Sequence, residues 1–364
     1  MKVGTAESEP GEISRGHLSV AELPTGGDER LPVVVVEGEE PGPTAWATGA
    51  IHGDEPTGTA AIHEFLDRVR DRAKPLRGTL VCVPVTNPAG VRTNSRTSYY
   101  HGDDPNRLFG VGREGESEGG SGGGDGGTPP RVQQVICERL YEEIRADADV
   151  VVSLHTSWVA THPYTIRPRV GYGAHREEAA AASLRDRVVE LADAFGLPVV
   201  NQFGRAETER RALAHTLTGA AVADGIPAFT PELGGRFVVE RDAREAAVAG
   251  LFGVCSTLGM LDDVPEDRSP AFKLSAEGDL KRLVHPHADA AGLVRYRVRE
   301  GEWVDSGDVV ADVRTPHGER KSTVATERSG YVLSLHEGAA VYENDPLLDL
   351  AVPDGEPLLY ERSG

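Results

Sequence analysis

Six short apolar runs divide the first 260 residues of this chain, and helical patterns fill the gaps between them. The runs are rich in β-branched residues and lie at 32–37, 44–51, 78–85, 149–154, 197–200 and 226–231. The helical patterns lie at 57–70, 130–145, 177–195, 208–224 and 240–260. Buried strands that alternate with helices predict an α/β fold, with a mixed, largely parallel sheet and helices on both faces.

The pattern changes at two places. Residues 112–128 contain only small, polar and acidic residues apart from one arginine, so we expect a disordered surface insertion there. After about residue 270 the chain consists of short alternating runs separated by turn signals, which is typical of an all-β domain. The sequence therefore predicts an α/β domain over 1–270 and a small β domain over 271–364.

Composition restricts the class of partner. The formal charge of −20 argues against nucleic acid and against an anionic membrane, which leaves small molecules. Only five of the 38 basic residues are lysine, and an acidic, lysine-poor surface suits a high-salt cytoplasm, although a bias toward arginine codons would give the same count. Three scattered cysteines, Cys82, Cys137 and Cys255, indicate neither a disulfide framework nor a thiolate metal site. No segment resembles a signal peptide or a membrane span, so we expect a soluble cytoplasmic protein.

Reactive side chains follow four of the predicted strands. Ligands of an open parallel sheet bind outside the carboxyl ends of its strands, so these positions are candidates for a site. They comprise His52 and Glu55 after the second run, Asn87, Arg92 and Arg96 after the third, His155 after the fourth, and Glu232 after the last.

Two imidazoles and one carboxylate form the ligand set of many catalytic zinc sites, which leave a position open for water. His52, Glu55 and His155 would supply this set, and bound zinc would activate water and polarise a carbonyl group. Glu232 is the candidate for the general base that later protonates a leaving amine. The alternatives are a core histidine at 155 and a surface carboxylate at 232. An HxxE match alone is weak evidence, since His175 and Glu178 form a second copy at the start of a helical pattern.

Five segments in this order resemble the succinylglutamate desuccinylase/aspartoacylase family, which has a zinc carboxypeptidase-like fold. They are GAIHGDEPTG at 49–58, NPAGVRTNSR at 87–96, DPNRLF at 104–109, DVVVSLHTSW at 149–158 and TPELGG at 230–235. The resemblance implies one zinc ion held by His52, Glu55 and His155, with Glu232 as general base and acid. It further implies that Arg96 polarises the scissile carbonyl, with Arg92 as its rival.

The same resemblance implies that Asn106 and Arg107 hold the substrate carboxylate, which suits the planar fork of a guanidinium. It also implies a tyrosine over the site, for which Tyr164 is a candidate. The C-terminal β domain resembles the barrel-sandwich fold of biotinyl and lipoyl carriers. Those carriers place a lysine at a hairpin tip, whereas this chain has TPHG there and Lys321 follows later, so we expect no attachment.

These features predict a zinc-dependent amide hydrolase, a deacylase acting on N-acyl amino acids or related small amides. N-acetylated diaminobutyrate, a product of ectoine breakdown on which some family members act, is one candidate substrate. A zinc carboxypeptidase is the alternative within the enzyme class, and a non-catalytic metal-binding or ligand-binding protein is the alternative outside it. The sequence leaves open whether the chain forms homo-oligomers.

Overall fold

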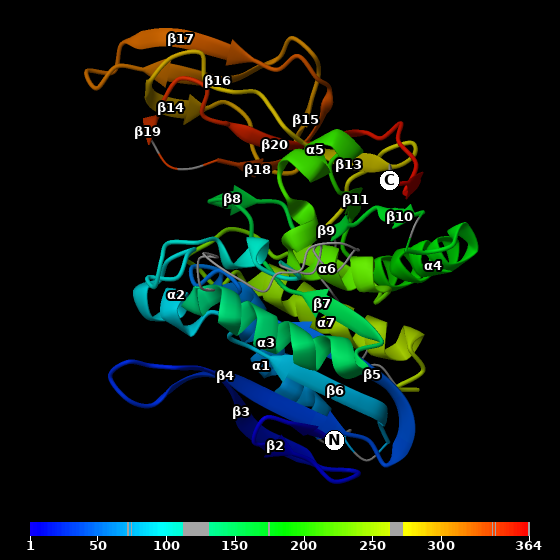
Figure 1. The fold of residues 1–364 in the computed structure, drawn as a ribbon. Helices are drawn as coiled ribbons and strands as arrows, with labels where there is room; N and C mark the ends of the chain where they lie inside the picture. The colour runs from blue at the N-terminus through cyan, green and yellow to red at the C-terminus, as the bar shows by residue number, and fades with distance from the viewer. Residues whose placement is uncertain are drawn as a thin grey trace, which may run out of the picture.

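The structure is a computed structural model that describes residues 1–70, 73, 75–111, 131–173, 175–262, 272–336, 338 and 340–362. It confirms the predicted α/β class. One large mixed sheet runs through the molecule, in the order β15-β18-β20-β13-β11-β9-β12-β7-β5-β6-β4-β3 (Figure 1). Its central strands are parallel neighbours and carry the residues of interest: β6 (Arg77–Val83), β5 (Glu40–Thr48), β7 (Val150–Ser153) and β12 (Ala228–Glu232).

Antiparallel strands flank this parallel centre. On one side β4 (Asp28–Glu37) pairs with β6 and with β3 (Ile13–Glu22), and on the other β9 (Tyr164–Arg167) runs antiparallel to β12. β9 then pairs in parallel with β11 (Val199–Asn201). The sequence analysis did not predict β3 or β9. Three further short strands are β1 (Lys2–Val3), β2 (Ala6–Glu7) and β8 (Ala160–Thr161).

Helices cover both faces of the sheet, because side chains of a strand point alternately to the two sides. Ala45 and Ala47 of β5 pack into one core with α1 (Pro56–Val69) and α7 (Arg241–Thr257). Trp46, between them, packs into the other core with α3 (Val132–Asp147) and α6 (Leu217–Asp224). The remaining helices are α2 (Pro88–Thr93), η2 (Pro105–Arg107), α4 (Glu178–Ala194), α5 (Arg205–Arg210) and η3 (Leu213–His215).

The single helix expected over 208–224 is wrong. The chain instead forms α5, η3 and α6, separated by two breaks. At Ala212 the backbone is left-handed, with φ of 50°, so the helix ends there. At Thr216 the side chain accepts a hydrogen bond from the Gly219 amide at 3.0 Å and caps a new helix.

Four of the strands after residue 272 continue the large sheet. β13 (Leu280–Val284) pairs with β11 through Lys281 and Asn201, and it is followed across the sheet by β20 (Leu348–Pro353), β18 (Gly330–Leu335) and β15 (Trp303–Val304). A second sheet contains β17 (Arg320–Ala325), β16 (Val309–Arg314), β14 (Gly292–Tyr296) and β19 (Ala340–Val341). β21 (Leu359–Glu361) pairs separately with β10 (Val170–Tyr172).

We refer to residues 272–362 as the C-terminal β unit. It has an apolar core of its own, built from its two sheets, and lies at the opposite end of the molecule from β3 and β4 (Figure 1). The TPHG sequence lies between β16 and β17, and Lys321 of β17 donates a hydrogen bond to the Ala291 carbonyl at 3.1 Å. The predicted boundary at 270/271 and the predicted insertion at 112–128 lie outside the described residues.

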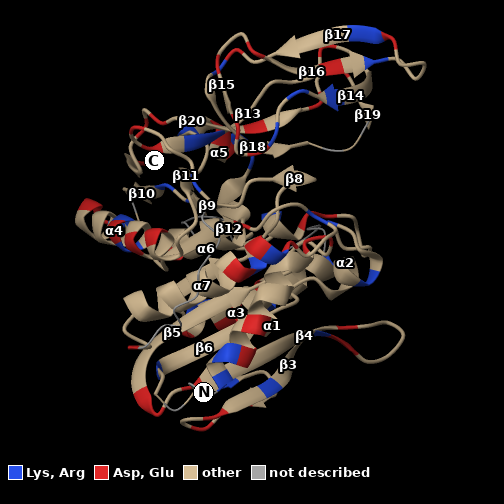
Figure 2. Ribbon diagram, turned by 180° about the vertical axis from the view of Figure 1, so that it is seen from behind, with Lys and Arg blue, Asp and Glu red and all other residues tan. Residues whose placement is uncertain are grey.

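Charged residues of both signs are distributed over the outside of the molecule, for example along α4 (Figure 2). None of the helices in the described part of the chain has both the length and the apolarity needed to cross a membrane. All three cysteines are free and buried.

Candidate metal centre and active site

The segment between β5 and α1 presents His52 and Glu55. β5 ends at Thr48, and Pro56 begins α1, where its fixed φ suits the first helical position. Glu55 is the N-cap residue, yet its side chain makes no capping hydrogen bond, so the carboxylate is available to other partners. At Gly53 the turn touches α2 so closely that a Cβ atom would lie 2.0 Å from the Gly90 carbonyl carbon. Only glycine fits at this approach.

His155 and Glu232 come from the neighbouring parallel strands β7 and β12. The two residues form an isolated parallel bridge, in which the His155 amide donates to the Pro231 carbonyl at 2.9 Å and the Leu233 amide donates to the His155 carbonyl at 2.8 Å. Both side chains therefore leave the sheet at the carboxyl ends of their strands. This is the edge at which open parallel sheets bind ligands.

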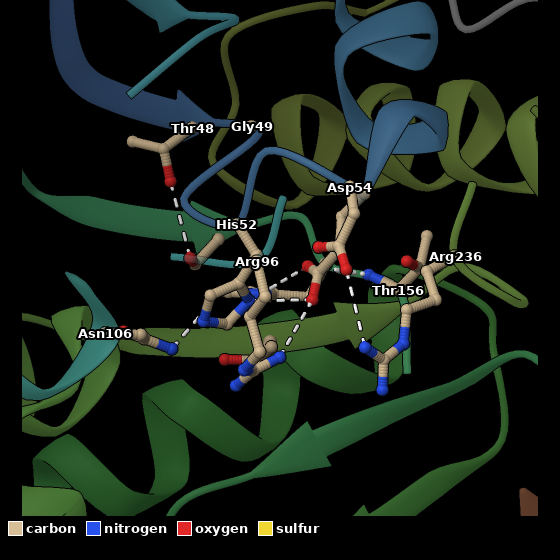
Figure 3. A network of polar contacts seen from close by, with 12 residues as sticks. Thr48, Gly49, His52, Asp54, Arg96, Asn106, Thr156 and Arg236 are labelled. Carbon is tan, nitrogen blue, oxygen red and sulfur yellow. Dashed lines mark hydrogen bonds and ion pairs between the residues drawn. The ribbon is translucent and has the colours of Figure 1, made fainter. Parts of the chain in front are cut away.

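Three side chains meet at this edge and could hold a metal ion. The Nδ1 atom of His52 lies 2.7 Å from Glu55 Oε1, and the Nδ1 atom of His155 lies 2.9 Å from Glu55 Oε2. One ligand atom from each residue falls within 4.8 Å of the others, and all three side chains are buried. Glu55 Oε2 also accepts a hydrogen bond from the Thr156 amide at 3.1 Å, which fixes the carboxylate between the two rings (Figure 3).

The arrangement fits a cation. Both ring nitrogens of His52 face carboxylates, since Nε2 lies 3.0 Å from Asp104 Oδ1 on the side opposite Glu55. Although burial alone would lower the pKa of His52, the charge of Glu55 and the hydrogen bonds of Asp104 and Glu55 raise it. The Nδ1 side of His52 is thus a place where positive charge is stabilised. A metal ion bound there would replace the proton between His52 and Glu55.

Asp104 is a functional candidate that the sequence analysis missed. Besides His52, it accepts hydrogen bonds from Arg96 at 3.0 Å and from the Asn106 amide at 2.9 Å. A carboxylate that binds the ring nitrogen facing away from the metal orients the histidine ring and makes its other nitrogen a stronger metal ligand. In the sequence, Asp104 begins the DPNRLF segment. That segment alone does not show that Asp104 contacts His52, which lies 52 residues earlier.

The pKa values of the two glutamates shift in opposite directions, because the nearby charges outweigh burial at Glu55 and burial outweighs them at Glu232. Burial would raise the pKa of Glu55, yet the charges of His52 and His155 hold it far below its usual range. For Glu232 burial dominates and raises the pKa, although the charge of His155 opposes it. Glu232 is 8% exposed, and its Oε2 atom has no hydrogen-bond partner among the described residues. A buried carboxylate with a free oxygen and a raised pKa is suited to proton transfer.

Arg92 and Arg96, the two candidates for polarising the substrate carbonyl, have different partners in the structure. Arg92 forms a two-pronged ion pair with Glu29 of β4, with both N–O distances 2.7 Å. Arg96 lies 3.4 Å from Glu55 and 3.0 Å from Asp104 (Figure 3). Of the two, Arg96 is therefore the one placed beside the candidate metal centre, and its action on a carbonyl stays a prediction.

Asn106 and Arg107 both lie in η2, and the Asn106 side chain reaches the candidate metal centre. Asn106 Nδ2 is 3.4 Å from His155 Nε2, while its Oδ1 accepts from the Leu217 amide at 2.9 Å. Asn106 thus contacts a candidate ligand, and substrate binding by this residue stays a prediction. Arg107 donates to the Asn106 carbonyl at 2.7 Å. Tyr164 is fully buried and is the register partner of Glu232 between β9 and β12.

Comparison with known proteins identifies the family. The family model of the succinylglutamate desuccinylase/aspartoacylase catalytic domain matches residues 41–258, which contain every site residue described above. The chain belongs to this family. Members are amide hydrolases that act on carbon–nitrogen bonds other than peptide bonds, so the predicted enzyme class is confirmed. The carboxypeptidase and non-catalytic alternatives are accordingly disfavoured.

Relatives of this family match nearly the whole chain. The N-alpha-acetyl-L-2,4-diaminobutyric acid deacetylase of Halomonas elongata is 26% identical over 359 residues, which cover 95% of this chain and 94% of the relative. The succinylglutamate desuccinylase/aspartoacylase of Rhodobacter sphaeroides superposes with a TM-score of 0.72 at 23% identity, covering 94% of this chain and 96% of its own. The product-bound structure of the ectoine utilization protein EutE (DoeB) from Ruegeria pomeroyi gives a TM-score of 0.72 at 23% identity, with coverages of 93% and 95%. These solved structures confirm the predicted fold, including the C-terminal β unit.

Proposed function

We propose that this protein is a zinc-dependent deacylase that hydrolyses the amide bond of N-acyl amino acids. The observation that carries the proposal is the convergence of His52, Glu55 and His155 beside Glu232, whose buried oxygen has no partner among the described residues. Nα-acetyl-L-2,4-diaminobutyrate is the first substrate to test, because the Halomonas elongata relative carries the name of that deacetylase. The acid-rich, lysine-poor composition and the three free cysteines support a cytoplasm of high salt content as the setting.

The donor set supports zinc as the metal. Two imidazole nitrogens and a carboxylate form a ligand set typical of catalytic zinc. Asp104 contacts the Nε2 atom of His52, and Asn106 contacts the Nε2 atom of His155. When bound, zinc would lower the pKa of a coordinated water and polarise the substrate carbonyl. His52, Glu55 and His155 would hold the ion.

The other residues of the site would then perform the proton transfers and the binding. Glu232 takes a proton from the attacking water as the new carbon–oxygen bond forms, and delivers it to the nitrogen as the carbon–nitrogen bond breaks. Burial raises the pKa of Glu232, which strengthens its carboxylate as the acceptor of that proton. Arg96 stabilises the negative charge that develops on the carbonyl oxygen, and Arg107 binds the substrate carboxylate.

The test distinguishes a loss of catalysis from a loss of metal binding. Glu232→Gln keeps the shape of the side chain but removes the proton acceptor, so kcat should fall at least about 100-fold while zinc content stays near one ion per chain. His155→Ala should lose the zinc itself. Glu343→Gln removes an exposed carboxylate of the C-terminal β unit and should change neither quantity.

The assay uses zinc-loaded protein in high salt with N-acetyl, N-succinyl and N-formyl amino acids and, as a comparison, dipeptides. Metal content is measured by elemental analysis and amine release by chromatography. Wild-type activity in the Glu232→Gln protein would place the base elsewhere. Full zinc occupancy in the His155→Ala protein would contradict the ligand assignment.

A further inference from the structure

Glu29, a buried residue of β4, contacts the segment that carries Arg96. Its side chain is 1% exposed and forms the two-pronged ion pair with Arg92 of α2. The hydroxyl group of Tyr100 donates a hydrogen bond to Glu29 Oε2 at 2.6 Å. Arg96 lies midway between Arg92 and Tyr100 in the sequence. A single carboxylate, 63 residues before Arg92, therefore holds the chain on both sides of Arg96.

The stretch 97–102, which follows Arg96, has few other attachments. It forms neither helix nor strand. Among the described residues, only Tyr99 and Tyr100 link this stretch to other segments by hydrogen bonds. The Tyr99 hydroxyl accepts from Arg92 at 3.2 Å, so both links end at the same ion pair. The course of the chain after Arg96 therefore depends on that pair.

Arg96 reaches the candidate metal centre from this segment. Its guanidinium lies 3.4 Å from Glu55 Oε1 and 3.0 Å from Asp104 Oδ2, and its side chain is 38% exposed (Figure 3). The contact with Glu55 is long for a charge-assisted hydrogen bond, so it holds the guanidinium only weakly. A misplacement of about 1 Å in a group that acts on the reacting atoms can cost about 100-fold in rate. The position of the backbone at Arg96 thus matters for what its side chain can do.

We propose that Glu29 is a positioning residue for Arg96. By holding Arg92 and Tyr100 together, Glu29 fixes the segment from which the Arg96 guanidinium reaches the carbonyl oxygen of the substrate. This inference rests on the proposed function for that role of Arg96. A buried polar network whose members are all hydrogen-bonded makes the surrounding chain rigid. Glu29 therefore acts on the reaction through the chain that it holds.

The first test measures the steady-state kinetics of zinc-loaded protein on Nα-acetyl-L-2,4-diaminobutyrate. In Glu29→Gln, kcat should fall about 10- to 100-fold, because the misplaced Arg96 stabilises the transition state less well. KM and zinc content should change less than about threefold, because neither substrate binding nor the metal ligands depend on this contact. Asp312→Asn is the matched control. Asp312 is a buried carboxylate of the C-terminal β unit that also pairs with a partly exposed arginine, Arg297, and accepts from a hydroxyl group, that of Thr323. Its kcat should match that of the wild type.

A double-mutant cycle distinguishes positioning from a general loss of stability. If Glu29 acts through Arg96, Glu29→Gln should lower kcat no further in an Arg96→Ala protein, because no guanidinium is left to position. A general loss of folded protein would instead lower the activity by the same factor in both backgrounds. An equal fall in kcat with and without Arg96 would therefore overturn the proposal.

A milder variant covers the case in which Glu29→Gln does not fold, since that change takes the buried charge away from Arg92. Tyr100→Phe removes one hydroxyl group but keeps the ion pair and the ring that packs against the core. It should unfold near the wild-type temperature and still lower kcat about 3- to 10-fold, the effect expected from the loss of one hydrogen bond. A wild-type kcat in a folded Tyr100→Phe protein would contradict the proposal.

Hydrogen–deuterium exchange tests the positioning without any need for activity. The amides of residues 97–102 should exchange faster in Glu29→Gln and in Tyr100→Phe than in the wild type, and at the wild-type rate in Asp312→Asn. If the wild-type protein hydrolyses no N-acyl amino acid, the proposed function fails, while exchange still decides whether Glu29 fixes this segment. Unchanged exchange in Glu29→Gln would refute the positioning role whether or not the protein is active.

Discussion

Removal of Asp104 should weaken metal binding although Asp104 is not one of the three candidate ligands. Its carboxylate lies 3.0 Å from His52 Nε2 and 3.0 Å from Arg96, and accepts from the Asn106 amide at 2.9 Å. The first contact orients the His52 ring with Nδ1 toward Glu55. The second neutralises a guanidinium that lies 3.4 Å from Glu55 and would otherwise repel a divalent cation.

The size of the effect follows from these contacts. Loss of an outer partner of a ligand histidine typically costs about 10- to 100-fold in metal affinity, or roughly 1.4–2.7 kcal/mol. Asp104→Asn keeps an acceptor oxygen for His52 and for the Asn106 amide, so we expect about a 10-fold loss. Asp104→Ala removes the acceptor as well and leaves Arg96 unopposed, so we expect about a 100-fold loss.

The measurement is zinc affinity by competition with a chromogenic chelator at fixed pH and salt. Asp103→Asn is the matched control, because Asp103 carries the same charge one residue earlier but pairs with Arg131. Its zinc affinity should match that of the wild type. An Asp104→Ala protein that binds zinc within about twofold of wild type would refute the role of Asp104 and with it the proposed orientation of His52.

Further predictions concern binding, catalysis and stability. Arg107→Ala should mainly raise KM, while Arg96→Ala should mainly lower kcat, and steady-state kinetics that give the reverse would exchange their roles. Arg92→Gln should lower the free energy of unfolding, since it breaks a pair whose glutamate is buried, but should leave zinc content unchanged in elemental analysis. Burial would raise the pKa of Asp349, yet its bonding to His336 and Arg282 holds it well below the usual range. Asp349 therefore stabilises the fold above a pH of about 4, and this contribution is lost as pH falls through its folded pKa. Asp349→Asn should cost about 3–5 kcal/mol near neutral pH in denaturant titrations, and the difference from wild type should shrink below about pH 4.

The convergence of the three candidate metal ligands was predictable because their positions depend on local order in the chain. His52 and Glu55 lie three residues apart at a strand end, and His155 ends the neighbouring buried strand, so the rule that parallel strands present their carboxyl ends at one edge brings them together. The same rule placed Glu232. It could not choose between Arg92 and Arg96, because both follow β6 and only the position of Glu29 on β4 shows which of them is already paired.

Local sequence patterns predicted the α/β class, the helices on both faces of the sheet, the all-β character of the C-terminal unit and the residues of the candidate metal centre. Each of these follows from apolar periodicity or from motifs within a few residues. The folded chain was needed to show that β9 lies between β12 and β11 in the sheet and that Asp104 holds His52. The contact between Asp104 and His52 joins residues 52 positions apart, and β9 pairs with β12 across more than 60 residues, so no local pattern records them.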